Sequence, residues 1–172
     1  LKRLEAFESD RVFCRHNLEH FVSVARIAYI HALENCLINE EDVLCHDAEK
    51  ADCSESYKKN YGCLISKDLI YFTSLLHDIG RLFEYEEGTP HDEASVEIAI
   101  SFLDESTFNR AQEKLILDCI KEHRGRTEIN TDSSGDSVQE LLIKIFKRSD
   151  KESRMCFTCK AYDDCYWSEE KK

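Results

Sequence analysis

Three His-Asp dipeptides occur in the sequence, at His46-Asp47, His77-Asp78 and His91-Asp92. The second differs from the others because it lies in the segment SLLHDIG, whose apolar residues recur at helical spacing and predict a buried helix. A histidine beside a carboxylate is costly to bury among leucines unless both groups share a metal ion or a hydrogen-bond network. The dipeptide at 77–78 is therefore either a buried, hydrogen-bonded pair or part of a metal site.

Three other histidines and one aspartate stand on separate expected helices, each at the edge of an apolar face: His20, His91, His123 and Asp150. Asp150 ends an apolar stripe formed by Leu142 and Phe146, where an unpaired charge is expensive and requires a cation. Imidazole nitrogens and carboxylate oxygens together suit Fe, Mn, Co, Ni or Zn rather than Ca or Mg. If these helices converge, we expect one or two divalent transition-metal ions at their meeting point.

The elements that must position these residues are predicted to be helices. The chain of 172 residues has only 5 Gly and 1 Pro, too few for the turns of a many-stranded sheet, so we expect an all-α fold. Apolar periodicity predicts one long helix over 11–36 and a second, largely buried helix over about 66–80. Ser66 is the expected N-cap of the second helix.

Start signals predict three more helices. Thr89 followed by Pro90 indicates a helix with Thr89 as N-cap and Pro90 in the first helical position. A further helix is expected over about 110–124. Ser137 and Glu140 form the sequence pattern of a capping box, which predicts the start of the last clear helix.

The organisation predicted is a single domain over 1–172, with an irregular insertion at about 38–65 and a cysteine-bearing tail at about 154–172. Lys and Arg number 23 against 35 Asp and Glu, and the net charge of −12 would repel a phosphate backbone, which argues against duplex nucleic acid as a partner. No apolar run is long enough to span a membrane, and LKRLEAFESD lacks the apolar centre of a signal peptide. We therefore expect a cytoplasmic protein with no membrane partner.

The order of the ligand candidates resembles that of the HD-domain metal-dependent phosphohydrolases. His20, which is followed by VSVARIA, matches their first metal ligand. His77 and Asp78 match the pair that gives the family its name, and Asp150 in IFKRSD matches the closing ligand. The resemblance implies an all-α HD-domain helical bundle with a central metal pocket, in which these four residues hold one ion.

Two further histidines extend the resemblance to members with two metal ions. His91 in TPHDEAS and His123 in CIKEHRG match the additional ligands, and Asp78 would then bridge both ions. The implied function is a metal-dependent phosphohydrolase that cleaves a nucleotide or a related phosphoester or phosphoanhydride with a metal-activated hydroxide, Asp78 being catalytic. The compact size and the six ligands are more narrowly similar to bacterial hydrolases that split diadenosine tetraphosphate symmetrically.

Basic residues near these motifs are candidates for phosphate contacts. Arg81 stands where the family usually has Lys and is the second residue we expect to be catalytic. Arg124 and Arg126 are either phosphate contacts or solvated residues at a helix end. His16 lies one turn before His20 and is expected to support a ligand rather than to bind metal. The remaining histidines are expected at the surface or in the insertion: His31 and His46.

Nine cysteines are many for a cytoplasmic protein, in which thiols stay reduced. In the tail, MCFTCKAYDDCYW has the ligand spacing of a thiolate metal site, formed by Cys156, Cys159 and Cys165. A structural Zn would take its fourth ligand from the insertion, where the candidates are Cys45, Cys53, Cys63 and His46. The alternative is that the tail cysteines are reduced and pack beside aromatic residues. Three others are expected to be small buried hydrophobes: Cys14, Cys36 and Cys119.

Two other classes of function remain open. A non-catalytic module could keep the metal pocket to sense a nucleotide or to bind a partner. A zinc-dependent interaction protein could instead be organised by its cysteines. The presence of all six ligand types favours the enzyme, with a phosphorylated small molecule as its partner.

Overall fold

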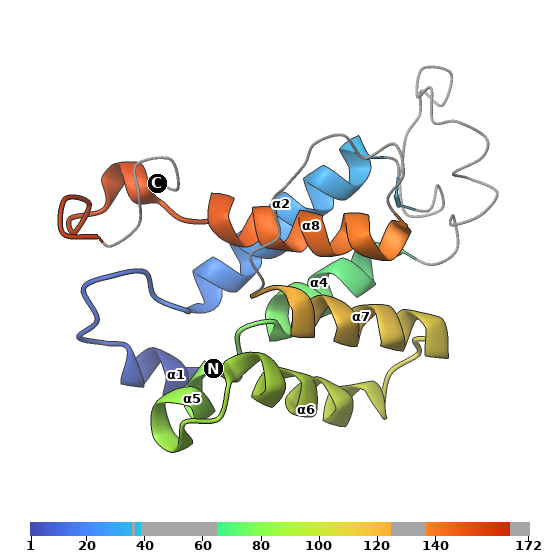
Figure 1. The fold of residues 1–172 in the computed structure, drawn as a ribbon, viewed down its shortest axis with the longest axis horizontal. Helices are drawn as coiled ribbons and strands as arrows, with labels where there is room; N and C mark the ends of the chain where they lie inside the picture. The colour runs from blue at the N-terminus through green and yellow to red at the C-terminus, as the bar shows by residue number, and fades with distance from the viewer. Residues whose placement is uncertain (36, 39–64, 125–136, 166–172) are drawn as a thin grey trace.

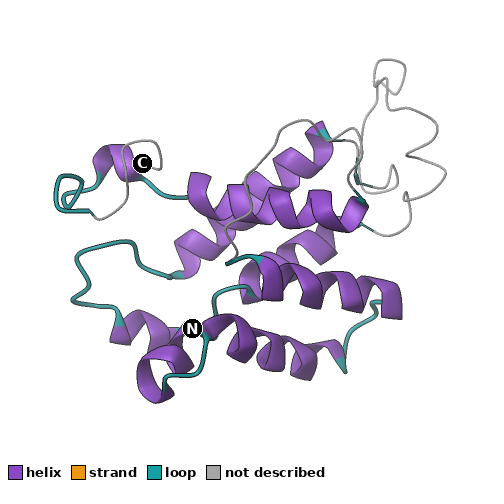
Figure 2. Ribbon diagram, in the orientation of Figure 1, coloured by secondary structure: helices purple, strands orange, loops and turns teal. Residues whose placement is uncertain are grey.

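The computed structural model describes residues 1–35, 37–38, 65–124 and 137–165, and this part of the chain is all-α, as predicted (Figures 1 and 2). The helices are α1 (Lys2–Phe7), α2 (Leu18–Glu34), α4 (Lys67–Leu76), α5 (Arg81–Glu87), α6 (His91–Leu103), α7 (Arg110–Glu122) and α8 (Val138–Glu152), and a 3-10 helix, η2 (Cys156–Thr158), follows. Most of the predicted insertion lies outside the described residues. Among the helices that are described, none is both long and apolar enough to cross a bilayer.

The main core lies where α2 packs against α4 and α8, and where α7 packs against α4, α6 and α8 (Figure 1). Its fully buried side chains include Leu69, Ile116, Ile120, Leu142 and Phe146. A smaller cluster of Leu4, Phe21 and Leu82 joins α1, α2 and α5. Burial of these apolar surfaces fixes the helices relative to one another and so fixes whatever their ends carry.

Side-chain caps define several helix starts. The hydroxyl of Ser66 accepts a hydrogen bond from the Leu69 N–H at 3.1 Å, which confirms the predicted N-cap of α4. The capping box of Ser137 and Glu140 is also confirmed at the start of α8. A second capping box, formed by Asn109 and Gln112 at the start of α7, was not predicted from the sequence.

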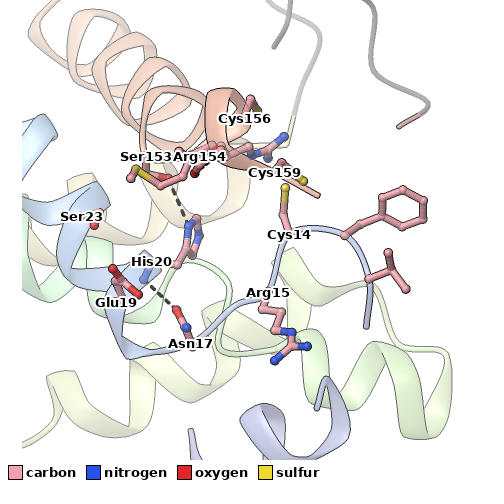
Figure 3. A pocket seen from close by; sticks show the side chains of 14 residues that line it. Cys14, Arg15, Asn17, Glu19, His20, Ser23, Ser153, Arg154, Cys156 and Cys159 are labelled. Carbon is pink, nitrogen blue, oxygen red and sulfur yellow. Dashed lines mark hydrogen bonds between the residues drawn. The ribbon is translucent and has the colours of Figure 1, made fainter. Parts of the chain in front are cut away.

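The predicted start of the first long helix was wrong. The helix begins at Leu18 rather than near 11, because the Asn17 side chain caps it by accepting from the His20 N–H at 2.9 Å (Figure 3). Residues 11–16 form a loop instead, and the Glu8 carboxylate holds its end by accepting from the backbone N–H of His16 at 2.5 Å.

The predicted caps near 90 and the end of the 66–80 helix also need correction. Helix α6 begins at His91, and Pro90, with φ −52° and ψ 128°, is its N-cap, so Thr89 lies outside the helix. Helix α4 ends at Leu76, and residues 77–80 form a turn that leads into α5. This turn carries the His77-Asp78 pair.

Candidate metal centre

Gly80 sets the position of the turn that carries His77 and Asp78. Its N–H donates to the Ser95 hydroxyl on α6 at 2.9 Å. A Cβ at this position would lie 2.3 Å from the carbonyl oxygen of His91 and 2.5 Å from the Ser95 nitrogen. Only glycine therefore allows α6 to approach the turn this closely, and that approach brings His91 beside Asp78.

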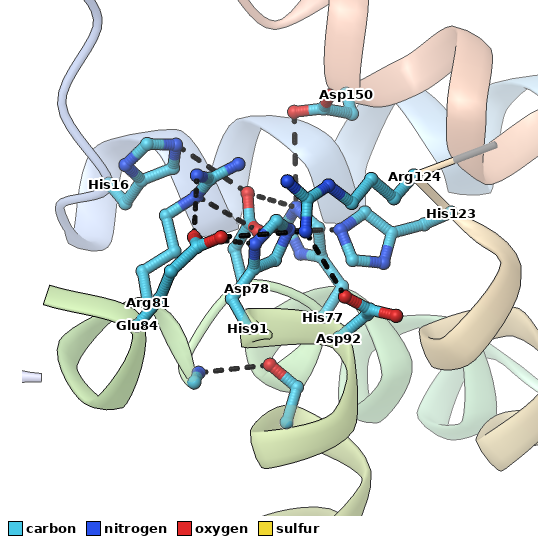
Figure 4. A network of polar contacts seen from close by, with 12 residues as sticks. His16, His77, Asp78, Arg81, Glu84, His91, Asp92, His123, Arg124 and Asp150 are labelled. Carbon is cyan, nitrogen blue, oxygen red and sulfur yellow. Dashed lines mark hydrogen bonds and ion pairs between the residues drawn. The ribbon is translucent and has the colours of Figure 1, made fainter. Parts of the chain in front are cut away.

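All six predicted ligands come together at this point. Figure 4 shows His77, Asp78, His91, His123 and Asp150. The six form two groups whose candidate ligand atoms lie within 4.8 Å of one another: His20, His77, Asp78 and Asp150 in the first, and Asp78, His91 and His123 in the second. Asp78 belongs to both groups. The structure therefore has the shared carboxylate that a two-ion centre needs.

The ligand candidates sit at helix ends. His20 lies in the first turn of α2, His91 is the first residue of α6, and His123 is the C-cap of α7. Asp150 lies in the last turn of α8. Because the middles of these helices are buried in the common core, their ends meet at one place without any ligand residue disturbing the apolar packing.

The Asp78 carboxylate lies between the imidazoles. Its Oδ1 is 3.2 Å from Nε2 of His91 and 3.3 Å from Nε2 of His123, and its Oδ2 is 3.5 Å from Nε2 of His77. In the first group, Oδ1 of Asp150 is 3.5 Å from Nε2 of His20. Asp78 is almost completely buried, with 1% of its surface exposed.

The other nitrogen of each ring is held by a separate partner. Nδ1 of His77 donates to the Ser74 carbonyl at 2.7 Å, and Nδ1 of His123 donates to the Ile120 carbonyl at 2.5 Å. Nδ1 of His91 contacts the Glu84 carboxylate at 2.7 Å. A carbonyl can only accept, so the proton of a neutral ring sits on Nδ1 and the Nε2 lone pair points into the centre.

A hydroxyl group places the proton of the His20 ring on Nδ1 in the same way. Ser153 Oγ lies 3.1 Å from Nδ1 of His20 and donates its own hydrogen to the Asp150 carbonyl at 2.8 Å. Its oxygen is therefore left to accept from Nδ1, which again turns the Nε2 lone pair inward. Asp150 is linked in turn to Arg154, whose Nη2 lies 3.0 Å from Oδ2.

Five buried ligand atoms at the centre have no hydrogen-bond partner, and neither has Nε of Arg81 beside Asp78. The five are Nε2 of His20, His77 and His91, and Oδ1 of Asp78 and Asp150. These atoms are lone-pair donors that face one another, an arrangement that is costly unless a cation lies among them. Imidazole and carboxylate ligands are those preferred by divalent transition metals. The residues present therefore fit the metal that the sequence predicts, and Nδ1 contacts of this kind typically orient metal-bound histidines.

The electrostatics of the centre favour a positive charge at the same place. Burial raises the pKa of Asp78, but the neighbouring His77, His123 and Arg81 outweigh it and hold that pKa well below its usual value. Burial lowers the pKa of His20 to about 4, with a further contribution from His77, so this ring is neutral at physiological pH. An ionised Asp78 and a neutral His20 are in the protonation states that metal binding requires. Burial lowers the pKa of His77, but Asp78 and Asp150 outweigh it and raise that pKa, so a metal ion would have to displace a proton from this ring.

His16 supports a ligand, in agreement with the sequence analysis. Its Nε2 lies 3.5 Å from Oδ2 of Asp78, and its Nδ1 contacts Glu8 at 2.7 Å. The predicted surface position of His31 was wrong, because this side chain is buried and contacts Glu152 at 2.6 Å. His46 lies outside the described residues.

Arg81 is placed beside the centre. Its Nε lies 3.1 Å from Oδ1 of Asp78, and its Nη1 lies 3.5 Å from Glu84. Arg124 contacts the other oxygen of Glu84 at 3.4 Å and is more exposed. Arg126 lies outside the described residues. The phosphate contacts expected of these arginines remain predictions.

Two carboxylates in the surroundings of the centre were not foreseen. Glu84 contacts the ring of His91 and two arginines, and Glu8 is 2% exposed beneath His16. Burial raises the pKa of Glu8, but hydrogen bonds from His16 and Tyr85 outweigh it and lower that pKa to about 2. With 35 acidic residues in the chain, no sequence signal separates these two from solvated ones.

Comparison with known proteins supports the class that the fold and the centre define. The HD domain family matches residues 17–155, a range that contains all six ligand candidates. The chain therefore belongs to the HD domain family, within the superfamily of metal-dependent phosphohydrolases.

A relative in Clostridium beijerinckii, named "Uncharacterized protein", is 37% identical over 172 residues, which are 100% of this chain and 86% of the relative. No solved structure matches the chain significantly.

Proposed function

We propose that the protein hydrolyses a phosphoester or phosphoanhydride of a small phosphorylated molecule, with a nucleotide as the substrate class. The observation that carries this proposal is the position of Asp78 in two ligand groups at once. Two divalent ions held there would polarise phosphoryl oxygens and lower the pKa of a coordinated water toward about 7.

The residues of the chain have distinct roles in this proposal. Asp78 is the shared ligand; His20, His77 and Asp150 complete one group, and His91 and His123 complete the other. The outer contacts of the rings keep the ligand atoms in place before substrate arrives, which reduces the reorganisation needed during the reaction.

Arg81 is the residue that we assign to the substrate phosphate. Its Nε faces Asp78, and its side chain is 22% exposed, so part of the guanidinium can reach an anion at the edge of the centre. Arginine provides a planar set of donors that binds phosphate oxygens in pairs, whereas lysine provides a point charge. This positive charge offsets the repulsion of an anionic substrate by the acidic chain, whose net charge is −12.

The test is hydrolysis of a substrate panel by the full chain supplied in turn with Mn²⁺, Fe²⁺, Co²⁺, Ni²⁺ and Zn²⁺. The panel contains nucleoside mono-, di- and triphosphates and dinucleoside polyphosphates, including diadenosine tetraphosphate. We expect metal-dependent turnover that is lost in Asp78→Asn and kept in the matched variant Asp118→Asn, which changes a partly exposed aspartate on α7. Nucleotide binding without turnover by the metal-loaded protein would favour the sensor, and equal turnover by Asp78→Asn would contradict the proposed centre.

A further inference from the structure

Cysteines from two distant segments line one pocket, between the loop that precedes α2 and the tail that follows α8 (Figure 3). Among the described residues, no three of their sulfur atoms lie within 4.8 Å of one another. The two segments enclose a pocket of about 310 Å³, and three of its lining residues are Cys14, Cys156 and Cys159. No disulfide joins the cysteines in the described part of the chain, where these three are free thiols. The pocket therefore gathers reduced cysteines from the two ends of the chain.

We propose that Cys14, Cys156, Cys159 and Cys165 form a thiolate metal site that ties the loop before α2 to the C-terminal tail. The site takes a thiophilic centre, which is either a zinc ion or an iron–sulfur cluster, since both are held by four cysteine thiolates. The expected fourth ligand from the insertion is replaced by Cys14.

The two tail cysteines are arranged on one turn. Cys156 begins η2, and the Cys159 N–H donates to the Cys156 carbonyl at 3.0 Å. Both cysteines of the CxxC line the same pocket, and the Cys14 side chain points toward Cys159 (Figure 3). A CxxC turn facing a cysteine from a distant segment is a common arrangement of thiolate ligands.

The thiols are also close enough to affect one another electrostatically. Partial burial of its sulfur raises the pKa of Cys14. Arg154 lowers this pKa, and Cys156 and Cys159 raise it further. A shared cation would deprotonate coordinating thiols outright.

The tail has little apolar packing of its own. Among residues 155–165, Ala161 is the buried side chain, while Met155 and Phe157 are 61% and 79% exposed. A segment this small does not bury enough surface to fix its conformation, and small segments of this kind usually depend on metals or disulfides. The metal site supplies the missing constraint.

Cys165 is the fourth ligand because the same series of turns continues to it. The Tyr162 N–H donates to the Cys159 carbonyl at 3.2 Å, and the Cys165 N–H donates to the Tyr162 carbonyl at 3.4 Å. The histidine that lines the same pocket, His20, is engaged elsewhere, with Nδ1 beside Ser153 and Nε2 beside Asp150. Four thiolates give a closed site, which is typical of structural metals.

The test is the metal content of the full chain, prepared without oxygen or chelators in an Asp78→Ala background so that the His/Asp centre contributes nothing. Zinc, iron and acid-labile sulfide are measured per chain, which distinguishes a zinc ion from an iron–sulfur cluster. We expect Cys14→Ser to lose this metal and the matched variant Cys45→Ser to keep it. Retention of the metal by Cys14→Ser, or its loss from Cys45→Ser, would overturn the assignment of Cys14.

A second measurement uses the unaltered protein and does not depend on the folding of a variant. The cysteines are alkylated before and after treatment with a chelator that strips metal, and the modified peptides are quantified by mass spectrometry. We expect Cys14, Cys156, Cys159 and Cys165 to be protected together and to become reactive together. Equal alkylation of Cys14 in both states would contradict the site.

Discussion

The His/Asp centre and the cysteine site are built in opposite ways. The ligands of the His/Asp centre stand at the ends of helices whose middles share a buried core, and each ring is oriented by a second partner at Nδ1. The cysteines stand on a loop and a tail with little apolar burial. Packing therefore positions the ligands of the His/Asp centre before metal binds, whereas metal binding itself must organise the cysteine site.

The largest effect should come from the core that holds the His/Asp centre. Phe146 is 2% exposed on α8, and Phe146→Ala is expected to cost about 3–5 kcal/mol of the free energy of unfolding. Phe157 in the tail is 79% exposed, and Phe157→Ala should change it by less than about 0.5 kcal/mol. Denaturant unfolding of both variants measures the contrast, and comparable losses would contradict it.

A smaller effect is expected from Gly80. The Cβ of Gly80→Ala would press on the backbone of α6, and overpacking of this kind costs about 1–3 kcal/mol. Because the strain falls on the turn that carries His77 and Asp78, metal affinity at the His/Asp centre should fall as well. The matched variant is Gly88→Ala, at φ 77° with open space around it, which should lose stability through backbone strain and keep metal affinity. Thermal unfolding with metal titration separates the two, and unchanged metal affinity in Gly80→Ala would show that the turn does not position the ligands.

Removing the contact between Glu84 and His91 tests whether the partners at Nδ1 orient the histidine rings for metal binding. Glu84→Ala removes the acceptor at Nδ1, and loss of such a partner typically lowers metal affinity about 10–100-fold. Glu87→Ala, at the exposed end of the same helix, is the control and should leave affinity unchanged. Isothermal titration with Mn²⁺ or Zn²⁺ measures both, and equal affinities would mean that the Glu84 contact does not orient the ring.

The smallest effect is expected from Ser153. Ser153→Ala removes the hydroxyl that joins Nδ1 of His20 to the Asp150 carbonyl, and a neutral hydrogen bond contributes about 1 kcal/mol, or roughly fivefold in affinity. Thr158→Ala, which removes an exposed hydroxyl from the tail, is the control. The same titration should show a reduction for Ser153→Ala alone, and a reduction larger than that of Glu84→Ala would reverse the ranking.

The convergence of the six candidate ligands could be predicted from the sequence because several of them carry a local signal. His77, Asp78 and Asp150 are polar residues at the ends of apolar stripes, and burial there demands a compensating partner. The order of the long helices and the caps at Ser66 and Ser137 could be predicted for the same reason, since periodicity and capping patterns are local.

What the sequence did not reveal depends on contacts between distant segments. Glu8 holds the end of the loop before α2 through His16, so the helical periodicity over 11–16 was misleading. Cys14 was expected to be a buried hydrophobe, but it is exposed at the mouth of a pocket that it shares with the tail. Nothing near Cys14 or Glu8 in the sequence indicates these partners.

The most direct test of the central claim is element-resolved metal stoichiometry of the full chain, compared among the wild type, Asp78→Ala and Cys156→Ala. Asp78→Ala is expected to lose about two transition-metal ions, as befits a shared carboxylate, and to keep the thiolate-bound metal. Cys156→Ala should show the reverse. If the metal bound is zinc alone, lost with Cys156 and indifferent to Asp78, the hydrolase centre is contradicted and the cysteine site becomes the functional centre.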